Sequence, residues 1–187
     1  MVEDFSCLGA LVECEGGCEK EIRRRITLGK VVMQGLEKIW KDKYLSLQTK
    51  TRIVNAMTFP VILYGCETWT KTRAMEKKID ASEMWIWRRT LRVSWTKMRT
   101  NQSILMEIGH TRGDLSLRQR AAKQKMMFFC HVIRANGMET NMMLACREGR
   151  RKTGRPVKRR MEEMMSGINL AELRGTVEDQ DLCESIL

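Results

Sequence analysis

The longest uncharged stretch of this chain runs from Ile53 to Cys66, and it limits what the chain can fold into. Charged residues interrupt nearly every helical turn elsewhere, so such a run belongs either to a protein core or to a membrane. It is shorter than the roughly 20 residues that a membrane-spanning helix requires. We therefore expect it to lie in a protein core, and we expect no membrane partner.

A helix is expected to lead into this stretch. Ser46 is a suitable N-terminal cap, and the apolar residues after it recur near the helical period, at Leu47, Ile53, Val54, Met57 and Val61. Pro60 should kink or end the helix, because proline lacks the backbone donor that a helix interior needs. Gly65 is then expected to act as a stop, and Trp69 as a large anchor just beyond it.

The composition favours helices over a β-sandwich, because the chain has only two prolines, 15 methionines and 6% aromatic residues. We therefore predict a mainly α fold. The short apolar segment before Gly16 is expected to form a strand or hairpin. Period-3.6 patterns predict further helices that begin at Glu19, Thr72, Thr100 and Ser116.

Each long predicted helix has an expected inward face. In the six-turn helix from Glu19 this face contains Ile22, Ile26, Gly29, Met33, Leu36 and Trp40, and the residues largely off it are Arg23, Arg24, Arg25 and Lys30. After Thr72 it contains Met75, Ile79, Ser82 and Ile86. Between Ser116 and Arg134 the inward residues are Leu117, Ala121, Gln124, Phe128 and Val132, and the outward ones are Arg118, Arg120, Lys123 and Lys125. Later helices are expected from Pro156 to Met165 and after Asn169.

The charge balance indicates an anionic partner. Lys and Arg number 34 against 23 Asp and Glu, which gives a net charge of +11, and nucleic acid is the commonest partner of such a surplus. The densest basic cluster surrounds the segment Gly149 to Pro156 and contains Arg147, Arg150, Arg151, Lys152, Arg155, Lys158, Arg159 and Arg160. It could hold phosphates with little base specificity, act as a nuclear-import signal, or be a solvated loop.

A second basic cluster is interleaved with aromatic residues. It contains Arg88, Arg89 and Arg92, among the tryptophans Trp85, Trp87 and Trp95. Such a cluster could form a stacking platform for unpaired bases. Tryptophans at these spacings are more often packing residues, and we favour that interpretation.

Candidate catalytic and metal sites are scarce. The histidines are His110 and His131, and Cys130 next to His131 would point about 100° away on a helix. The seven cysteines include no CxxC pair, and no secretion signal is evident before them. We therefore predict reduced thiols in an intracellular protein, nuclear or cytoplasmic, with no catalytic residue, metal or cofactor.

Several ordered blocks resemble reverse transcriptases of LINE-type non-LTR retrotransposons. The segment FPVILYGCETW, residues 59–69, resembles the one that follows the palm in that family, and residues 79–96 and 101–105 look most like the RTE clade, BovB-like elements in particular. Residues 7–9 resemble its YLG-type strand, 21–26 its first thumb helix, 129–134 its FGHxxR segment and 149–156 its basic GRP loop. The family-motif residues are then Tyr64, Gly65, Glu67, Trp69, Trp85, Trp87, Trp95, His131 and Arg134.

The resemblance implies a thumb followed by a C-terminal region. We expect a palm-thumb junction in residues 1–18, a thumb-like helical domain in 19–95, a post-thumb helical region in 96–146, and a basic loop with C-terminal helices in 147–187. Family members polymerise DNA on RNA with palm aspartates that bind two metal ions, and no such motif is present here. The sequence also departs from the family at Cys130, Arg160 and Cys183, where glycine or tryptophan is usual.

Three functional hypotheses follow. The favoured one is a truncated reverse-transcriptase remnant that is not catalytic alone and binds RNA or DNA with low specificity. The second is a co-opted nuclear protein-interaction module. The third is an incomplete reading frame of an RNA-directed DNA polymerase, in which case the polymerase palm would be a further partner of this chain.

Overall fold

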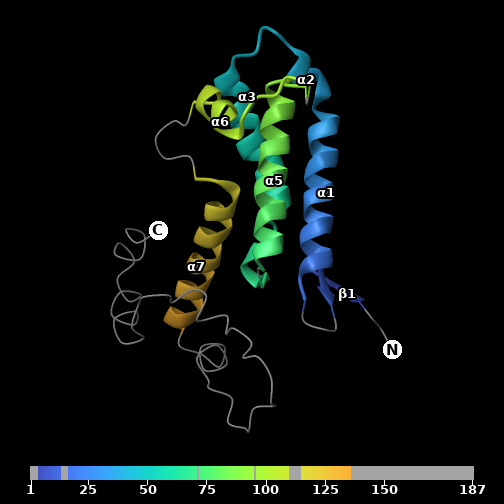
Figure 1. The fold of residues 1–187 in the computed structure, drawn as a ribbon. Coiled ribbons are helices and arrows are strands. Elements are labelled where there is room, and N and C mark those ends of the chain that lie inside the picture. Colours follow the sequence, from blue (N-terminus) through green and yellow to red (C-terminus); the bar gives the residue numbers. More distant parts are fainter. Residues whose placement is uncertain (1–3, 14–16, 71, 95, 110–114, 136–187) are drawn as a thin grey trace. The chain divides into compact units, whose positions relative to one another are not determined.

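A computed structural model of the chain describes residues 4–13, 17–70, 72–94, 96–109 and 115–135. It divides the chain into two units, Met1–Ala121 and Ala122–Leu187, and each is described by itself. The mainly α fold with a short N-terminal hairpin is confirmed (Figure 1). None of the helices in the described ranges has the length and apolar character needed to cross a membrane. Trp95, the basic cluster of residues 147–160 and the helices predicted after it lie outside these ranges.

The N-terminal element is an antiparallel hairpin of β1 (Asp4–Cys7) and β2 (Ala10–Glu13). Its turn consists of Leu8 and Gly9, both with positive φ, 48° and 78°. Two left-handed residues are what a type I′ turn requires, and this turn matches the natural twist of a hairpin. The predicted N-terminal strand therefore pairs with its own neighbour and needs no sheet elsewhere.

The predicted six-turn helix is divided in two, α1 (Glu19–Gly35) and α2 (Glu37–Lys41), and the prediction of one continuous helix is wrong. Glycine is a weak helix former, and the chain turns directly after Gly35. The Trp40 indole Nε1 then donates to the Met33 carbonyl at 2.8 Å, which satisfies an acceptor that the end of α1 leaves without a helical donor. The predicted inward residues are buried except Leu36, which is half-buried, and Glu21 and Arg25 are buried in addition.

The uncharged stretch forms a helix with a wide turn in the middle. It runs through α3 (Leu47–Ile53), the π-helical η1 (Val54–Thr58) and α4 (Phe59–Leu63). The cap at Ser46 is confirmed, since its side chain accepts from the Thr49 amide at 3.2 Å. Pro60 does not end the helix but lies in the first turn of α4, where its missing amide hydrogen costs least.

The π turn moves the buried face of this helix. A π turn takes up one extra residue, so every side chain after it is rotated from its expected position. Met57 is 49% exposed and Val61 only half-buried, whereas Phe59, Ile62 and Leu63 are buried. The predicted face is therefore right at Val54 and wrong after it.

The end of the uncharged stretch follows the prediction. Gly65 has a φ of 70°, a left-handed conformation that suits glycine, and it leads into the short 3-10 helix η2 (Cys66–Thr68). Trp69 follows and is 1% exposed. Both the stop at Gly65 and the anchoring role of Trp69 are confirmed.

Two more predicted helices are present with their caps. The side chain of Thr72 accepts from the Met75 amide at the start of α5 (Arg73–Thr90), and that of Thr100 accepts from the Ser103 amide at the start of α6 (Asn101–Glu107). The buried face of α5 contains the four predicted residues and adds Glu83, Trp87 and Thr90.

The face predicted for the last described helix, α7 (Leu117–Ala135), needs a correction. Leu117 and Ala121 are buried as expected. In the second unit Val132 is buried as predicted, but Gln124 and Phe128 are exposed and Phe129 and Cys130 are buried in their place. Lys125, which was predicted to face outward, is buried as well. The helical period alone could not decide which of two adjacent phenylalanines faces inward. It predicted Phe128, whereas the structure buries Phe129.

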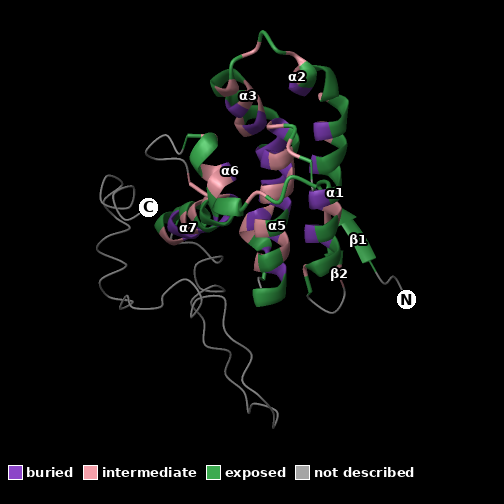
Figure 2. Ribbon diagram, turned by 45° about the horizontal axis from the view of Figure 1, so that its top comes forward, coloured by how far each residue is buried: buried purple, intermediate pink, exposed green. Residues whose placement is uncertain are grey.

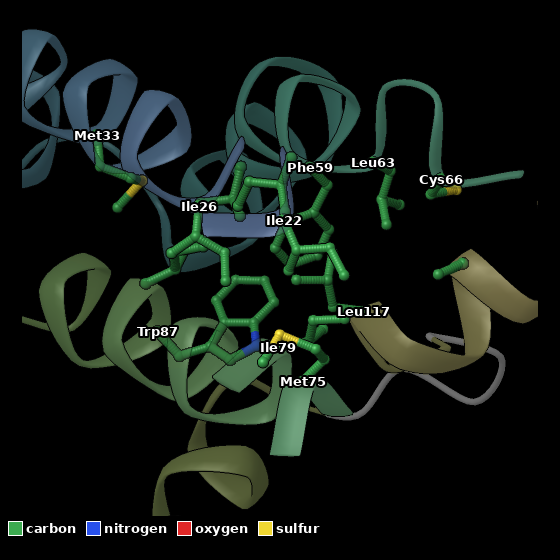
Figure 3. Packing of buried hydrophobic residues seen from close by; sticks show 14 of the residues in the cluster. Ile22, Ile26, Met33, Phe59, Leu63, Cys66, Met75, Ile79, Trp87 and Leu117 are labelled. Atoms are coloured by element: carbon green, nitrogen blue, oxygen red, sulfur yellow. The ribbon is translucent and has the colours of Figure 1, made fainter. Parts of the chain in front are cut away.

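The core of the first unit lies mainly between α1, α4 and α5. Figure 2 shows buried residues recurring along α1 and α5, with exposed ones between them. Phe59 and Trp87 meet edge to face, with ring centroids 5.4 Å apart, and Ile22, Ile26 and Ile79 lie close by (Figure 3). Trp87 is therefore a packing residue, as the favoured interpretation of the tryptophans predicted.

Candidate nucleic-acid interface

The N-terminal hairpin is attached to the first turns of α1 by charged side chains. Glu21 accepts from the Leu11 amide at 3.1 Å through Oε2 and from Arg25 Nε at 2.6 Å through Oε1. Both Arg24 and Arg25 donate to the Gly9 carbonyl in the hairpin turn. These contacts engage the Gly9 carbonyl of the turn and the Leu11 amide of β2.

A tyrosine from the motif after α4 completes this attachment. The Tyr64 hydroxyl donates to the Leu8 carbonyl at 2.7 Å, and the Arg25 guanidinium lies 4.3 Å from the centre of the Tyr64 ring. The structure thus brings together three separate segments, residues 7–9, 21–26 and 59–69. The sequence pattern identified each of them but gave no sign that they meet.

The charge state of this cluster is well defined. Burial raises the pKa of Glu21, but hydrogen bonds from Arg24, Arg25 and the Leu11 amide outweigh that effect, and the pKa is lowered overall. Glu21 is therefore ionised at neutral pH and holds both arginines. We conclude that Arg24 and Arg25 stabilise the fold and are not available to an anionic ligand.

The predicted cluster at the end of α5 separates into two kinds of arginine. Arg88 donates to the Arg99 carbonyl at 2.7 Å and to Asn101 Oδ1 at 3.0 Å, so it joins α5 to the start of α6. Arg89 and Arg92 are exposed. Arg89 and Arg92 are therefore the arginines of this cluster that an anionic ligand can reach. The sequence alone did not distinguish them from Arg88.

The backbone at the end of α5 has a defined shape. The Arg92 amide donates to the Arg89 carbonyl at 3.2 Å, and the Val93 amide donates to the Arg88 carbonyl at 2.9 Å. This pair of bonds is a Schellman motif, which places Arg92 at the left-handed position with a φ of 54°. Glycine is the usual residue there, and a residue with a Cβ costs roughly 1–2 kcal/mol.

Polar and aromatic side chains form a row along α1, α2 and α5, of which α1 and α5 run side by side (Figure 1). The Lys30 ammonium lies 5.6 Å from the centre of the half-buried Trp85 ring. Further along, Glu37 accepts from Lys41 at 3.1 Å and lies 3.5 Å from Arg89. We refer to Lys30, Trp85, Glu37, Lys41, Arg89 and Arg92 as the basic row.

One end of the basic row surrounds a cavity of about 170 Å³, lined by Glu37, Trp40, Lys41, Arg89 and Arg92. The hydrogen bond from Lys41 and the charges of Lys41 and Arg89 lower the pKa of Glu37, so this carboxylate is ionised. Three cations and one anion line the cavity, and its surroundings are therefore positive. Lys30, Glu37 and Lys41 were not predicted as site residues; the only signal for the last two was their i,i+4 spacing on a helix.

The remaining motif residues are distributed over the fold. Glu67 is half-buried in η2, while His131 and Arg134 are exposed on α7, where Arg134 donates to the Cys130 carbonyl at 3.4 Å. Cys130 is buried and its neighbour His131 is not, so the structure does not bring them together as a reactive pair. Among the described residues no group of three or more histidines, cysteines or acids could hold a metal ion.

Comparisons with protein-family models, with curated proteins and with solved structures find no match for this chain. The resemblance of its motifs to LINE-type reverse transcriptases therefore stays a prediction. The geometry of the basic row is the firmest basis for a function.

Proposed function

We propose that this chain is a thumb-like segment of a LINE-type reverse transcriptase of the RTE group, and that it binds the phosphate backbone of RNA or DNA. The observation that carries the proposal is the basic row on α1, α2 and α5, where the exposed Lys30 lies beside the half-buried Trp85. Its role is binding and not polymerisation, because the family polymerises DNA with palm aspartates and none of the matched motifs contains them.

The chemistry of the row suits a nucleic acid backbone. Lysine and arginine neutralise phosphates and release the counterions condensed around them, which supplies most non-specific affinity. Trp85 packs in part against the core, its remaining aromatic surface lies next to Lys30, and bases of any identity stack on aromatic rings. Contacts of these two kinds give affinity with little sequence preference, and we propose low specificity for this chain.

The basic cluster of residues 147–160 is included in the proposal as a second phosphate-binding segment. Its charge alone supports this role, since these residues lie outside the described ranges. With nucleic acid as ligand and cysteines expected to be reduced, we propose an intracellular location, in the nucleus or the cytoplasm.

Filter binding of the 187-residue chain to single-stranded RNA and DNA across a salt series tests the proposal. The logarithm of the association constant should fall linearly with the logarithm of the salt concentration, by about 0.7 for each phosphate contacted. The triple variant R150A/R151A/K152A should reduce that slope by about 2 if all three side chains contact phosphates. No binding at low salt, or binding that salt does not weaken, would refute the proposal.

A further inference from the structure

We infer that the cavity at the end of α5 is a binding site for a single phosphodiester group, with Lys41, Arg89 and Arg92 as its cationic contacts. The inference rests on the proposed function for the identity of the ligand, a nucleic acid strand, and adds the place where one of its phosphates binds. The sequence pattern pointed to Arg89 and Arg92 but not to the cavity, because its other residues come from α2.

The cavity has one apolar wall and a charged opening. Trp40 forms the wall: it is 2% exposed, and its only donor, Nε1, is already bonded to the Met33 carbonyl. Polar contacts to a ligand must therefore come from the cations around it. The volume of about 170 Å³ leaves room for a phosphate group with part of its sugar.

The charges around the cavity favour an anion. Glu37 is close to Lys41 and Arg89 and holds both at the opening, at 3.1 and 3.5 Å. Arg92 is exposed and makes no ion pair with any carboxylate of the described residues. Three cations less one carboxylate leave two positive charges for the single negative charge of a phosphodiester.

The backbone of Arg92 is an independent observation in favour of a ligand. A left-handed residue at a helix end is usually glycine, yet an exposed arginine occupies this position and lines the cavity. Strained backbone at non-glycine residues clusters at functional sites, where a side chain is needed despite the strain. The side chain at position 92 is, by this argument, retained for binding.

The position of the cavity on the basic row favours a strand over an isolated ion. Arg89 lies one helical turn beyond Trp85 on the same face of α5, and Trp85 is in turn next to Lys30. A strand whose phosphate occupies the cavity can therefore place a neighbouring base or phosphate along α1 and α5. We infer that the cavity fixes one backbone position and the rest of the row guides the strand.

The decisive variant is Arg92→Gly in the full chain, compared with Arg92→Lys and with Lys77→Ala. Glycine relieves the left-handed strain while removing the cation, so a loss of binding cannot be ascribed to unfolding. Lysine keeps the charge. Lys77 is exposed on the same helix, 12 residues before Arg89 and so roughly 18 Å away along its axis, and its removal lowers the net charge equally.

With a single-stranded oligonucleotide as probe, R92G should bind roughly fivefold more weakly at low salt, and its salt slope should be smaller by about 0.7. R92K should retain most of the affinity, and K77A should bind like the unaltered chain. Inorganic phosphate at equal ionic strength should compete poorly, because it makes none of the contacts that a strand makes along the rest of the basic row.

The outcomes separate this inference from the proposed function. If the unaltered chain binds the oligonucleotide and R92G binds equally well, or if R92G and K77A are weakened to the same extent, the cavity is not a phosphodiester site and the proposed function stands. If inorganic phosphate alone binds as tightly as the oligonucleotide and depends on Arg92, the site is one for free anions and the inference is overturned. If the unaltered chain binds no oligonucleotide, both proposals are refuted.

Discussion

Gly29 in α1 faces the side chain of Ile62 in α4 so closely that no larger residue fits between them. A Cβ added to Gly29 would lie 2.4 Å from Ile62 Cγ1 and 2.6 Å from Ile62 Cδ1. Both residues are buried, so neither has open space into which it could move. This contact sets how near α1 and the uncharged stretch can approach each other.

The substitution Gly29→Ala should therefore destabilise the protein. Overpacking a buried contact costs typically about 1–3 kcal/mol, which outweighs the gain of roughly 1 kcal/mol that alanine brings to a helix. Gly35 lies at the end of the same helix, and a Cβ added there would have no neighbour within 4 Å, so G35A is a matched control that should be neutral or stabilising. Urea unfolding measures both; equal effects of the two substitutions would contradict the close contact.

The sequence correctly predicted those features of the fold that depend only on residues close together in the chain. The caps Ser46, Thr72 and Thr100 were all identified, because an N-terminal cap depends on one side chain and an amide three residues later. The break at Leu36 and the π turn before Pro60 were missed. A periodic pattern does not contain the hydrogen bond from Trp40 to the Met33 carbonyl that accompanies the break, nor the packing of α4 against α1 that follows the π turn.

The residues of the basic row could be predicted from the sequence only in part, because their contacts depend on the tertiary structure. Arg88, Arg89 and Arg92 look alike in the sequence, and only the carbonyl of Arg99 and the side chain of Asn101 distinguish the first from the others. The cavity needs Glu37 and Arg89 close together, although 52 positions separate them in the chain. Net charge pointed to an anionic ligand, and tertiary structure decides which cations can reach it.

Removing the Tyr64 hydroxyl should loosen the N-terminal hairpin without unfolding the helices. Tyr64→Phe eliminates the hydrogen bond to the Leu8 carbonyl, worth roughly 0.5–1.5 kcal/mol, and keeps the ring over which Arg25 lies. Amide hydrogen exchange should become faster in β1 and β2 and stay unchanged in α5. Tyr44→Phe is a suitable control because Tyr44 is fully exposed. Unaltered exchange in the hairpin of Y64F would show that this bond does not hold it.

Removing the backbone strain at Arg92 should stabilise the protein. Arg92→Gly should raise the free energy of unfolding by about 1 kcal/mol, since glycine adopts a positive φ without steric cost. Arg92→Ala should give no such gain, because alanine keeps the Cβ that clashes. Thermal and urea unfolding of the two variants give the comparison, and a stability of R92G no higher than that of R92A would contradict the left-handed conformation.

Glu83 should make stability depend on pH in the opposite direction to Glu21. Its carboxylate is buried in α5 and accepts from the Leu117 amide at 3.0 Å. Burial raises the pKa of Glu83, with a further contribution from Asp80, although the Leu117 amide, Trp87 and Arg120 act against it. The folded protein therefore binds the proton more tightly than the unfolded chain, and this group's contribution to stability falls as pH rises from its ordinary pKa of 4.5 through the raised value.

The substitution Glu83→Gln isolates that contribution. Glutamine keeps an oxygen acceptor for the Leu117 amide but carries no charge, so the variant should be more stable than the unaltered protein at neutral pH, and the difference should shrink toward pH 4.5. Glu83→Ala removes the acceptor as well and should be destabilised at every pH, because the buried amide is left without a partner. Urea unfolding of the three proteins between about pH 4.5 and pH 8 measures these differences. A gap between E83Q and the unaltered protein that stays constant with pH would mean that the Glu83 carboxylate is ionised throughout, with a pKa that folding does not raise.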